Sequence, residues 1–122
     1  MNSILVVDDD RDHLGLLSHL VAGEGISAIF VPSGEEAILK LQGDHSITLL
    51  ITDLHMPGMD GIELAMLAKE MTPDITVVLM TGAISPDVPQ FAAEAGITKI
   101  IAKPFSPGQF LAIVRSKKYF SR

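Results

Sequence analysis

Four short apolar runs in this chain are each followed by side chains that can take part in acid, nucleophilic or electrostatic chemistry. These side chains are the carboxylates of Asp8-Asp9-Asp10 and Asp53, the hydroxyl of Thr81 and the ammonium of Lys103. A carboxylate can attack phosphorus and form an aspartyl phosphate. A hydroxyl and an ammonium can bind the charged oxygens of the transferring group. These residue types therefore suit phosphoryl transfer to an aspartate.

Carboxylates that share one edge of a fold repel each other, and this repulsion raises the pKa of at least one of them. A divalent cation relieves the repulsion. Hard oxygen ligands in a chain without cysteine favour Mg²⁺, with Mn²⁺ possible. We therefore expect a cation site among these aspartates.

The elements that would bring these residues together alternate between strand-like and helix-like segments. Five β-like runs are expected at Ile4–Val7, Ser27–Val31, Ile47–Thr52, Ile75–Met80 and Thr98–Ala102. Several are apolar throughout, as in parallel strands that are covered on both faces. The alternation predicts one α/β domain with a parallel sheet, whose strand ends meet at a common edge.

Helical spacing and capping signals lie between these runs. Apolar residues recur at i, i+3, i+4 and i+7 in two sets: Leu64, Leu67, Ala68 and Met71, and Val88, Phe91, Ala92 and Ala95. Ser33-Gly-Glu-Glu36 and Ser106-Pro-Gly-Gln109 read as capping boxes, and Ser85-Pro86 reads as a helix start. Gly43 and Gly96 are expected just where helices end.

Around these positions the sequence closely resembles a known family. The runs are Ile4-Leu-Val-Val-Asp-Asp9, Asp53-Leu-His-Met-Pro-Gly-Met-Asp-Gly61, Leu79-Met-Thr-Gly82 and Lys103-Pro-Phe105. They resemble the receiver domain of bacterial two-component response regulators, and the resemblance covers essentially all of residues 1–122 as a single domain. It implies a flavodoxin-like, doubly wound (βα)5 fold, with strand order 2-1-3-4-5 and helices on both faces.

The resemblance also implies a role for each reactive residue. Asp53 matches the phosphoacceptor, and Thr81 and Lys103 match the residues that contact the phosphoryl group. The implied Mg²⁺ ligands are Asp8, Asp9, Asp53 and the backbone carbonyl of His55. The bond between Lys103 and Pro104 would be cis.

The same resemblance implies partners. A histidine kinase or a histidine phosphotransfer protein would donate the phosphoryl group, and the domain would catalyse only its own phosphorylation and dephosphorylation. An output partner or a C-terminal effector domain would receive the signal, and the fourth and fifth helices could form a phosphorylation-dependent homodimer. The expected location is the cytoplasm.

Two features depart from the usual receiver pattern. Ile100 occupies a fifth-strand position that is often Tyr or Phe, so an aromatic ring cannot report the switch. Pro86 and Pro89 bracket the expected start of the fourth helix and could reshape the output face. His55 could act on the hydrolytic water or simply line the site entrance, and we favour the second interpretation. His13, His19 and His45 are interpreted as surface or helix residues.

Two other functions fit parts of the pattern. In a haloacid-dehalogenase-like phosphatase, Asp8-Asp9-Asp10 would supply the nucleophile, Asp8. That family places further metal-binding acids after its lysine, whereas no Asp or Glu follows Lys103. A pseudo-receiver that only binds partners is the second alternative, but each expected site residue is present.

Bulk properties narrow the remaining classes. The formal net charge of −6 argues against direct nucleic-acid binding. No apolar run approaches the ~20 residues that span a bilayer, so no membrane partner is expected. Basic residues gather at the end of the chain, at Arg115, Lys117, Lys118 and Arg122. They fit either the last turn of a helix or a linker beginning near 117–122.

Overall fold

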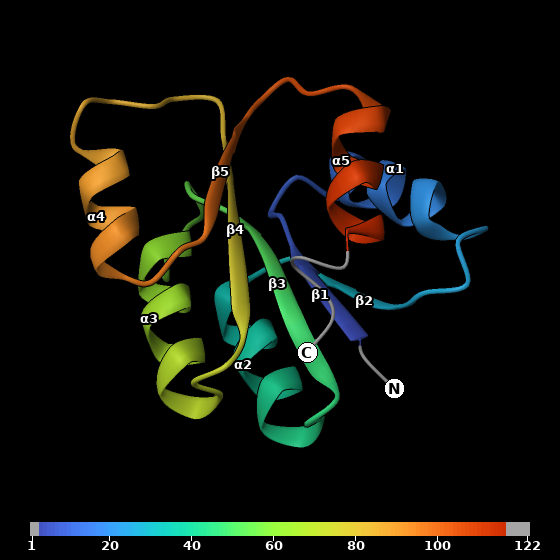
Figure 1. The fold of residues 1–122 in the computed structure, drawn as a ribbon, viewed down its shortest axis with the longest axis horizontal. Helices are drawn as coiled ribbons and strands as arrows, with labels where there is room; N and C mark the ends of the chain where they lie inside the picture. Colours follow the sequence, from blue (N-terminus) through green and yellow to red (C-terminus); the bar gives the residue numbers. More distant parts are fainter. Residues whose placement is uncertain (1–2, 117–122) are drawn as a thin grey trace.

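Strands and helices alternate along the chain. The structure is a computed structural model and describes residues 3–116 (Figure 1). The strands are β1 (Ser3–Val7), β2 (Ser27–Val31), β3 (Ile47–Asp53), β4 (Thr76–Thr81) and β5 (Lys99–Ala102). The helices are α1 (Arg11–Val21), α2 (Gly34–Gly43), α3 (Gly61–Met71), α4 (Val88–Glu94) and α5 (Pro107–Arg115). The five predicted β-like runs all form strands, and no end differs from its predicted position by more than one residue.

The five strands form one parallel sheet of order β2-β1-β3-β4-β5, which confirms the expected flavodoxin-like fold. In Figure 1, α1 and α5 lie on one side of the sheet, and α2, α3 and α4 lie on the other. Strand β2 is added on one side of β1, and β3, β4 and β5 are added on the other, so the strand order reverses between β1 and β3. Val7 pairs with Thr52 across that boundary, so Asp8 and Asp53 come next to each other at the carboxyl ends of adjacent strands. Ligands of doubly wound sheets bind at this kind of boundary.

Each central strand contributes to two apolar cores, one on either face of the sheet. In β3, Leu50 packs with α2 and α3, whereas Leu49 and Ile51 pack with α1 and α5. All three are fully buried. This explains the continuous apolar runs, because successive side chains point to opposite faces that are both covered. A fully buried leucine contributes about 2 kcal/mol to folding.

Side-chain caps fix the starts of α1, α3 and α5, at the edge of the sheet where the strands end. Asp10 caps α1 by accepting hydrogen bonds from the backbone N–H groups of Asp12 and His13. Asp60 and Glu63 form a reciprocal capping box at the start of α3. The capping box predicted at Ser106 is confirmed for α5.

The capping box predicted at Ser33 is only half formed. The Ser33 hydroxyl accepts from the backbone N–H of Glu36 and begins α2. Within residues 3–116, no bond runs back from the Glu36 carboxylate to Ser33. The Glu35 carboxylate instead accepts from the backbone N–H of Met59 at 3.3 Å, which ties the start of α2 to the loop before α3.

The predicted helix start at Ser85-Pro86 is wrong. Helix α4 begins at Val88, and Asp87 occupies the cap position without a side-chain hydrogen bond. Ser85 contributes only its backbone carbonyl, which accepts from the Val88 N–H at 3.1 Å. Pro89 therefore lies in the first turn, where a missing N–H leaves no helix hydrogen bond unmade, and it does not kink the helix.

The apolar faces expected for α3 and α4 are narrower than predicted. In α4, Val88 and Ala92 are buried but Phe91 is 51% exposed. In α3, Leu64 and Ala68 are fully buried, whereas the predicted Leu67 and Met71 are 39% and 38% exposed. Ala95, the C-terminal cap of the seven-residue helix α4, is also buried, so three of the four residues predicted for this apolar face are buried. Gly96 ends α4 as predicted, with a φ of 79° that favours glycine.

Part of the predicted basic end can be placed. Arg115 donates from Nε and Nη2 to the two carboxylate oxygens of Glu24, at 2.7 and 2.9 Å, and so joins α5 to the loop after α1. Lys117, Lys118 and Arg122, and the linker predicted near 117–122, lie outside the described residues. Within residues 3–116, no helix is both long and apolar enough to cross a membrane.

Gly61 permits the close approach of α3 to the end of β3. A Cβ atom at this position would lie 2.2 Å from the Asp53 carbonyl oxygen and 3.0 Å from the Leu54 Cα, both backbone atoms. We expect Gly61→Ala to lower the free energy of unfolding by about 2–3 kcal/mol, because the backbone must shift to relieve the overlap. Urea unfolding followed by far-UV circular dichroism measures this.

The matched control is Gly15→Ala in α1, where an added Cβ meets no atom within 4 Å. That change should raise the free energy of unfolding by about 0.5–1 kcal/mol, because alanine loses less backbone freedom than glycine. Equal tolerance of Gly61→Ala and Gly15→Ala would contradict the close approach of Gly61 to the Asp53 carbonyl oxygen.

Candidate functional site

Asp8 has no solvent exposure. It follows β1 directly, and three donors reach its carboxylate. The backbone N–H of Asp10 donates to Oδ1 at 3.0 Å, and Lys103 Nζ donates to Oδ2 at 3.0 Å. His13 Nδ1 lies 2.5 Å from the same Oδ2. Burial alone would raise the pKa of Asp8, but the hydrogen bonds from His13, Asp10 and Lys103 outweigh it and hold the pKa below its ordinary value. Asp8 is therefore a carboxylate at neutral pH.

Asp53 has the opposite electrostatic balance. It ends β3, is 8% exposed, and lies beside Lys103, whose Nζ is 3.3 Å from Oδ1. Burial raises the pKa of Asp53, and the negative charges of Asp8 and Asp9 raise it further against the opposing effect of Lys103. The predicted carboxylate repulsion is therefore present, and Asp53 is the residue that bears it.

Lys103 joins the two aspartates. It follows β5 and contacts both Asp8 and Asp53, and the Lys103–Pro104 bond is cis as predicted. Burial would lower the pKa of Lys103, but the hydrogen bond to Asp8 and the charges of Asp8 and Asp53 raise it overall. One ammonium thus lies against two carboxylates, and Asp9 adds a third negative charge nearby.

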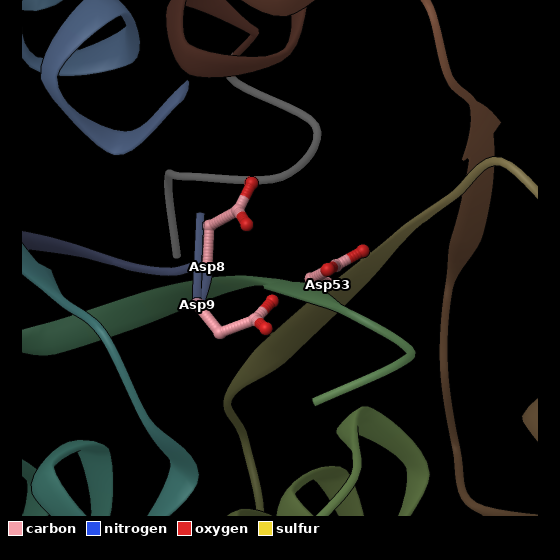
Figure 2. A group of neighbouring side chains, drawn as sticks. All are labelled: Asp8, Asp9 and Asp53. Atoms are coloured by element: carbon pink, nitrogen blue, oxygen red, sulfur yellow. The ribbon is translucent and has the colours of Figure 1, made fainter. Parts of the chain in front are cut away.

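Asp8, Asp9 and Asp53 form a group that could hold a cation. One carboxylate oxygen from each lies within 4.8 Å of the other two. Figure 2 draws the three side chains together, at the ends of β1 and β3. Oxygens on opposite sides of one Mg²⁺ are about 4.2 Å apart, twice the Mg–O distance, so modest side-chain rotation brings the set into range. Asp9 is exposed, which leaves that side of the group open to solvent.

Thr81 lies at the predicted end of β4 but its hydroxyl is engaged elsewhere. Oγ1 accepts from the Ala83 backbone N–H at 3.1 Å and donates to the Ala83 carbonyl at 3.3 Å. The residue is fully buried, and its carbonyl accepts from the Lys103 N–H at 2.8 Å. Thr81 is therefore tied to the Lys103 backbone, while its hydroxyl holds the loop after β4.

The side chain of His55 faces a hollow that the acidic residues do not line. Its side chain is exposed and lines a surface hollow with Ala83, Ile84, Ser85 and Val88. Of the other histidines, His19 and His45 are exposed, as expected. The hollow beside His55 includes none of the three aspartates, so the interpretation that His55 lines the site entrance stays a prediction.

His13 is a helix residue, as predicted, but its contact with Asp8 was not predicted. Its Nδ1 is the nearest donor to Asp8, and its ring lies 5.6 Å from that of Phe105. One sequence signal for this contact is the helix cap at Asp10. A helix that begins at Arg11 places His13 in its first turn, close to the end of β1. Neither spacing nor residue type alone indicates which way that side chain points.

The raised pKa of Asp53 predicts an effect on stability. In the presence of a chelator at pH 7, Asp53→Asn should raise the free energy of unfolding by on the order of 1 kcal/mol. The pKa of Asp53 is higher in the folded state than in the unfolded state, so the ionised form opposes folding at a pH above both pKa values. This penalty disappears as the pH falls below the ordinary aspartate value of 3.8. The gain from Asp53→Asn should shrink accordingly.

Urea unfolding at neutral and acidic pH, with Asp74→Asn as the exposed control, measures this gain. A loss of stability in Asp53→Asn at pH 7 would mean that the Lys103 ion pair outweighs burial and carboxylate repulsion.

Comparison with known proteins identifies the family. The family model of the response regulator receiver domain matches residues 4–115. Over 116 residues the chain is 35% identical to the transcriptional regulatory protein CpxR of Escherichia coli K12, covering 95% of this chain but only 49% of CpxR. The chain thus spans about half the length of that relative.

Other similar proteins are closer to this chain in length. It is 36% identical to the response regulator receiver protein CpdR of Brucella abortus, covering 86% of this chain and 87% of CpdR. It is also similar to the crystal structure of a CheY-like receiver domain protein from Methanospirillum hungatei, with a TM-score of 0.89 and 27% identity. That match covers 96% of this chain and 93% of the other. The chain belongs to the response regulator receiver domain family of two-component systems.

Proposed function

We propose that this receiver domain accepts a phosphoryl group on Asp53 and passes the resulting change to an output partner. The observation that carries the proposal is the position of Lys103, whose ammonium lies between the buried Asp8 and Asp53 at 3.0 and 3.3 Å. A cation that touches the acceptor oxygen can neutralise charge on a group that arrives there. The proposed donor is a histidine kinase or a histidine phosphotransfer protein.

The donor set suits a hard divalent cation. Asp8, Asp9 and Asp53 would hold Mg²⁺, or Mn²⁺, together with the backbone carbonyl of His55. When bound, the ion supplies positive charge that offsets the three carboxylates and the oxygens of the phosphoryl group. Asp9, exposed at the rim, offers its carboxylate from the solvent side.

The chain's own groups then have separate tasks. An Asp53 carboxylate oxygen attacks phosphorus, and the bond between phosphorus and the donor's imidazole nitrogen breaks. Lys103 is already within 3.3 Å of Asp53 and can bind a phosphoryl oxygen. Thr81 can donate to another after its hydroxyl leaves the Ala83 carbonyl. That exchange would pull on the loop after β4.

A small apolar cluster connects this loop with the face formed by α4 and β5. Leu79, two residues before Thr81, packs with Leu54, Val88 and Ala92, and Ile100 of β5 packs against the same cluster. Movement of Thr81 would bias a pre-existing equilibrium of α4 through this packing. Ile100 is partly buried against the cluster, so the proposed signal travels by a shift of packed aliphatic groups rather than by rotation of a ring.

The geometry disfavours Asp8 as a nucleophile. Asp8 is fully buried and its carboxylate already accepts three hydrogen bonds. In a phosphatase of the haloacid-dehalogenase type, Asp10 would be the second acid of the motif, but its carboxylate caps α1 instead. Asp53 is the less encumbered of the two candidates, because Lys103 is its one charged partner among the described residues.

Further parts of the proposal follow from the family. Residues 1–122 act as one receiver domain in the cytoplasm, which regulates an output partner or a C-terminal effector domain and does not itself bind nucleic acid. A phosphorylation-dependent homodimer through α4 and α5 is the proposed assembly. The domain accelerates its own phosphorylation and dephosphorylation only.

Intact-mass spectrometry after incubation with acetyl phosphate and Mg²⁺ tests the acceptor. The wild-type chain should gain one phosphoryl mass, and Asp53→Asn should gain none. Asp8→Asn should still be labelled, but more slowly, because it retains the acceptor and loses a cation ligand. A chelator should stop labelling of the wild-type chain.

The competing functions give different results. Labelling that survives Asp53→Asn but is lost in Asp8→Asn would overturn the proposal in favour of an Asp8 nucleophile. A wild-type chain that stays unlabelled with acetyl phosphate and with kinase donors would indicate a pseudo-receiver.

A further inference from the structure

His13 is held in place on several sides. It lies in the first turn of α1, where its own backbone N–H donates to the Asp10 carboxylate at 3.2 Å. Its ring lies against Phe105, tilted by 57°, and Phe105 stacks in turn on the fully buried Phe110. Its side chain is 22% exposed, and Nδ1 points to Asp8 Oδ2 at 2.5 Å. The ring orientation is thus set by packing as well as by the hydrogen bond.

The direction of that hydrogen bond follows from Asp8. The carboxylate is ionised and can only accept, so Nδ1 of His13 carries the proton and donates it. The imidazole acts as a donor here whether its other nitrogen is protonated or not. The contact is therefore a charge-assisted hydrogen bond inside the protein, where such bonds are strong.

The hydrogen bonds to Asp8 leave few lone-pair positions on its carboxylate for a cation. A carboxylate has about four lone-pair positions, two on each oxygen. On Oδ2 of Asp8, His13 and Lys103 occupy both. On Oδ1, the Asp10 N–H occupies one. The one remaining position is on Oδ1, and it is the position through which Asp8 can bind a cation.

Phosphorylation changes the demand on Lys103. If Lys103 turns from Asp8 to a phosphoryl oxygen on Asp53, Oδ2 loses one of its two donors. A buried carboxylate oxygen without a donor is destabilising, because nothing replaces the hydrogen bonds that it made to water. His13 approaches from α1, a different element from the one that carries Lys103, and so it can keep its bond to Oδ2 while the Lys103 side chain moves.

We propose that His13 is a positioning residue of the cation site, which fixes Asp8 through Oδ2 and thereby directs Oδ1 to the cation. This inference rests on the proposed function, because it concerns the same cation site. Hydrogen-bond partners of metal-binding carboxylates affect affinity by about 10–100-fold when removed. His13 would also hold Asp8 in place when Lys103 binds the phosphoryl group.

A purely structural role gives a different expectation. If His13 mattered only because its ring packs on Phe105, loss of the ring would lower stability and leave cation affinity unchanged. Asparagine separates these roles, because its side-chain nitrogen is attached to Cγ as Nδ1 of histidine is, while it lacks the rest of the ring. Phe105→Leu is the matched control for the packing, and His19→Leu the control for an exposed histidine of the same helix.

Binding of Mn²⁺ followed by electron paramagnetic resonance tests the inference without any phosphoryl transfer. In His13→Leu we expect the Mn²⁺ dissociation constant to rise by at least about tenfold. His13→Asn should stay within about threefold of wild type, since it keeps the donor. Phe105→Leu and His19→Leu should bind as wild type does. His13→Ala, with the same expected loss, replaces His13→Leu if that variant does not fold.

Each other result has a defined meaning. Wild-type affinity in His13→Leu, or tighter binding, would overturn the positioning role while leaving the proposed function intact. Equal losses in His13→Asn and His13→Leu would also overturn it, because the ring and not the donor would then matter. Failure of the wild-type chain itself to bind Mn²⁺ would overturn the cation site, and with it the proposed function.

Discussion

The crowding of three carboxylates at one edge of the sheet is the constraint from which the rest of the site follows. Strand order makes it unavoidable: β1 and β3 are neighbours, so Asp8 and Asp53 emerge side by side. Asp8 is stabilised by three donors, which lower its pKa. Asp53 is left with a raised pKa, because burial and the neighbouring charges outweigh Lys103. The fold therefore concentrates its electrostatic imbalance on the residue that we propose as acceptor.

That imbalance links stability to function. A site that is poorly compensated by its own residues gains most from added positive charge, so a divalent cation should bind where the penalty is largest. The elements around the site limit how it can respond. Gly61 lets α3 start directly against the Asp53 carbonyl, and the Thr81 carbonyl is bonded to the Lys103 N–H at the ends of β4 and β5. Leu79 of β4 packs in turn with Val88 and Ala92 of α4, so the end of β4 is connected to α4 by closely packed apolar groups.

The sequence is informative where single residues determine the outcome locally. Continuous apolar runs indicate the strands, and the residue types at the strand ends group Asp8, Asp53 and Lys103 at one edge of the sheet. The order of the strands follows from the family resemblance, since periodicity does not encode it. The capping signal at Ser106 is reliable because both halves of the box lie within four residues.

Features that depend on tertiary packing are less predictable. The predicted start of α4 is wrong because Val88 and Ala92 are the residues that meet the sheet, and their burial outweighs the local signal at Ser85-Pro86. The contact of His13 with Asp8 escapes prediction for a related reason. It depends on the Asp10 cap, the direction of α1 and the nearness of Phe105, and no short motif encodes that combination.

Mapping the acyl phosphate to one residue is the most direct measurement. After incubation with acetyl phosphate and Mg²⁺, borohydride reduction converts a phosphorylated aspartate to homoserine, which peptide mass spectrometry locates. We predict conversion at Asp53, with Asp8 and Asp9 unchanged. Conversion at Asp8 would contradict the assignment of Asp53 as the acceptor beside Lys103.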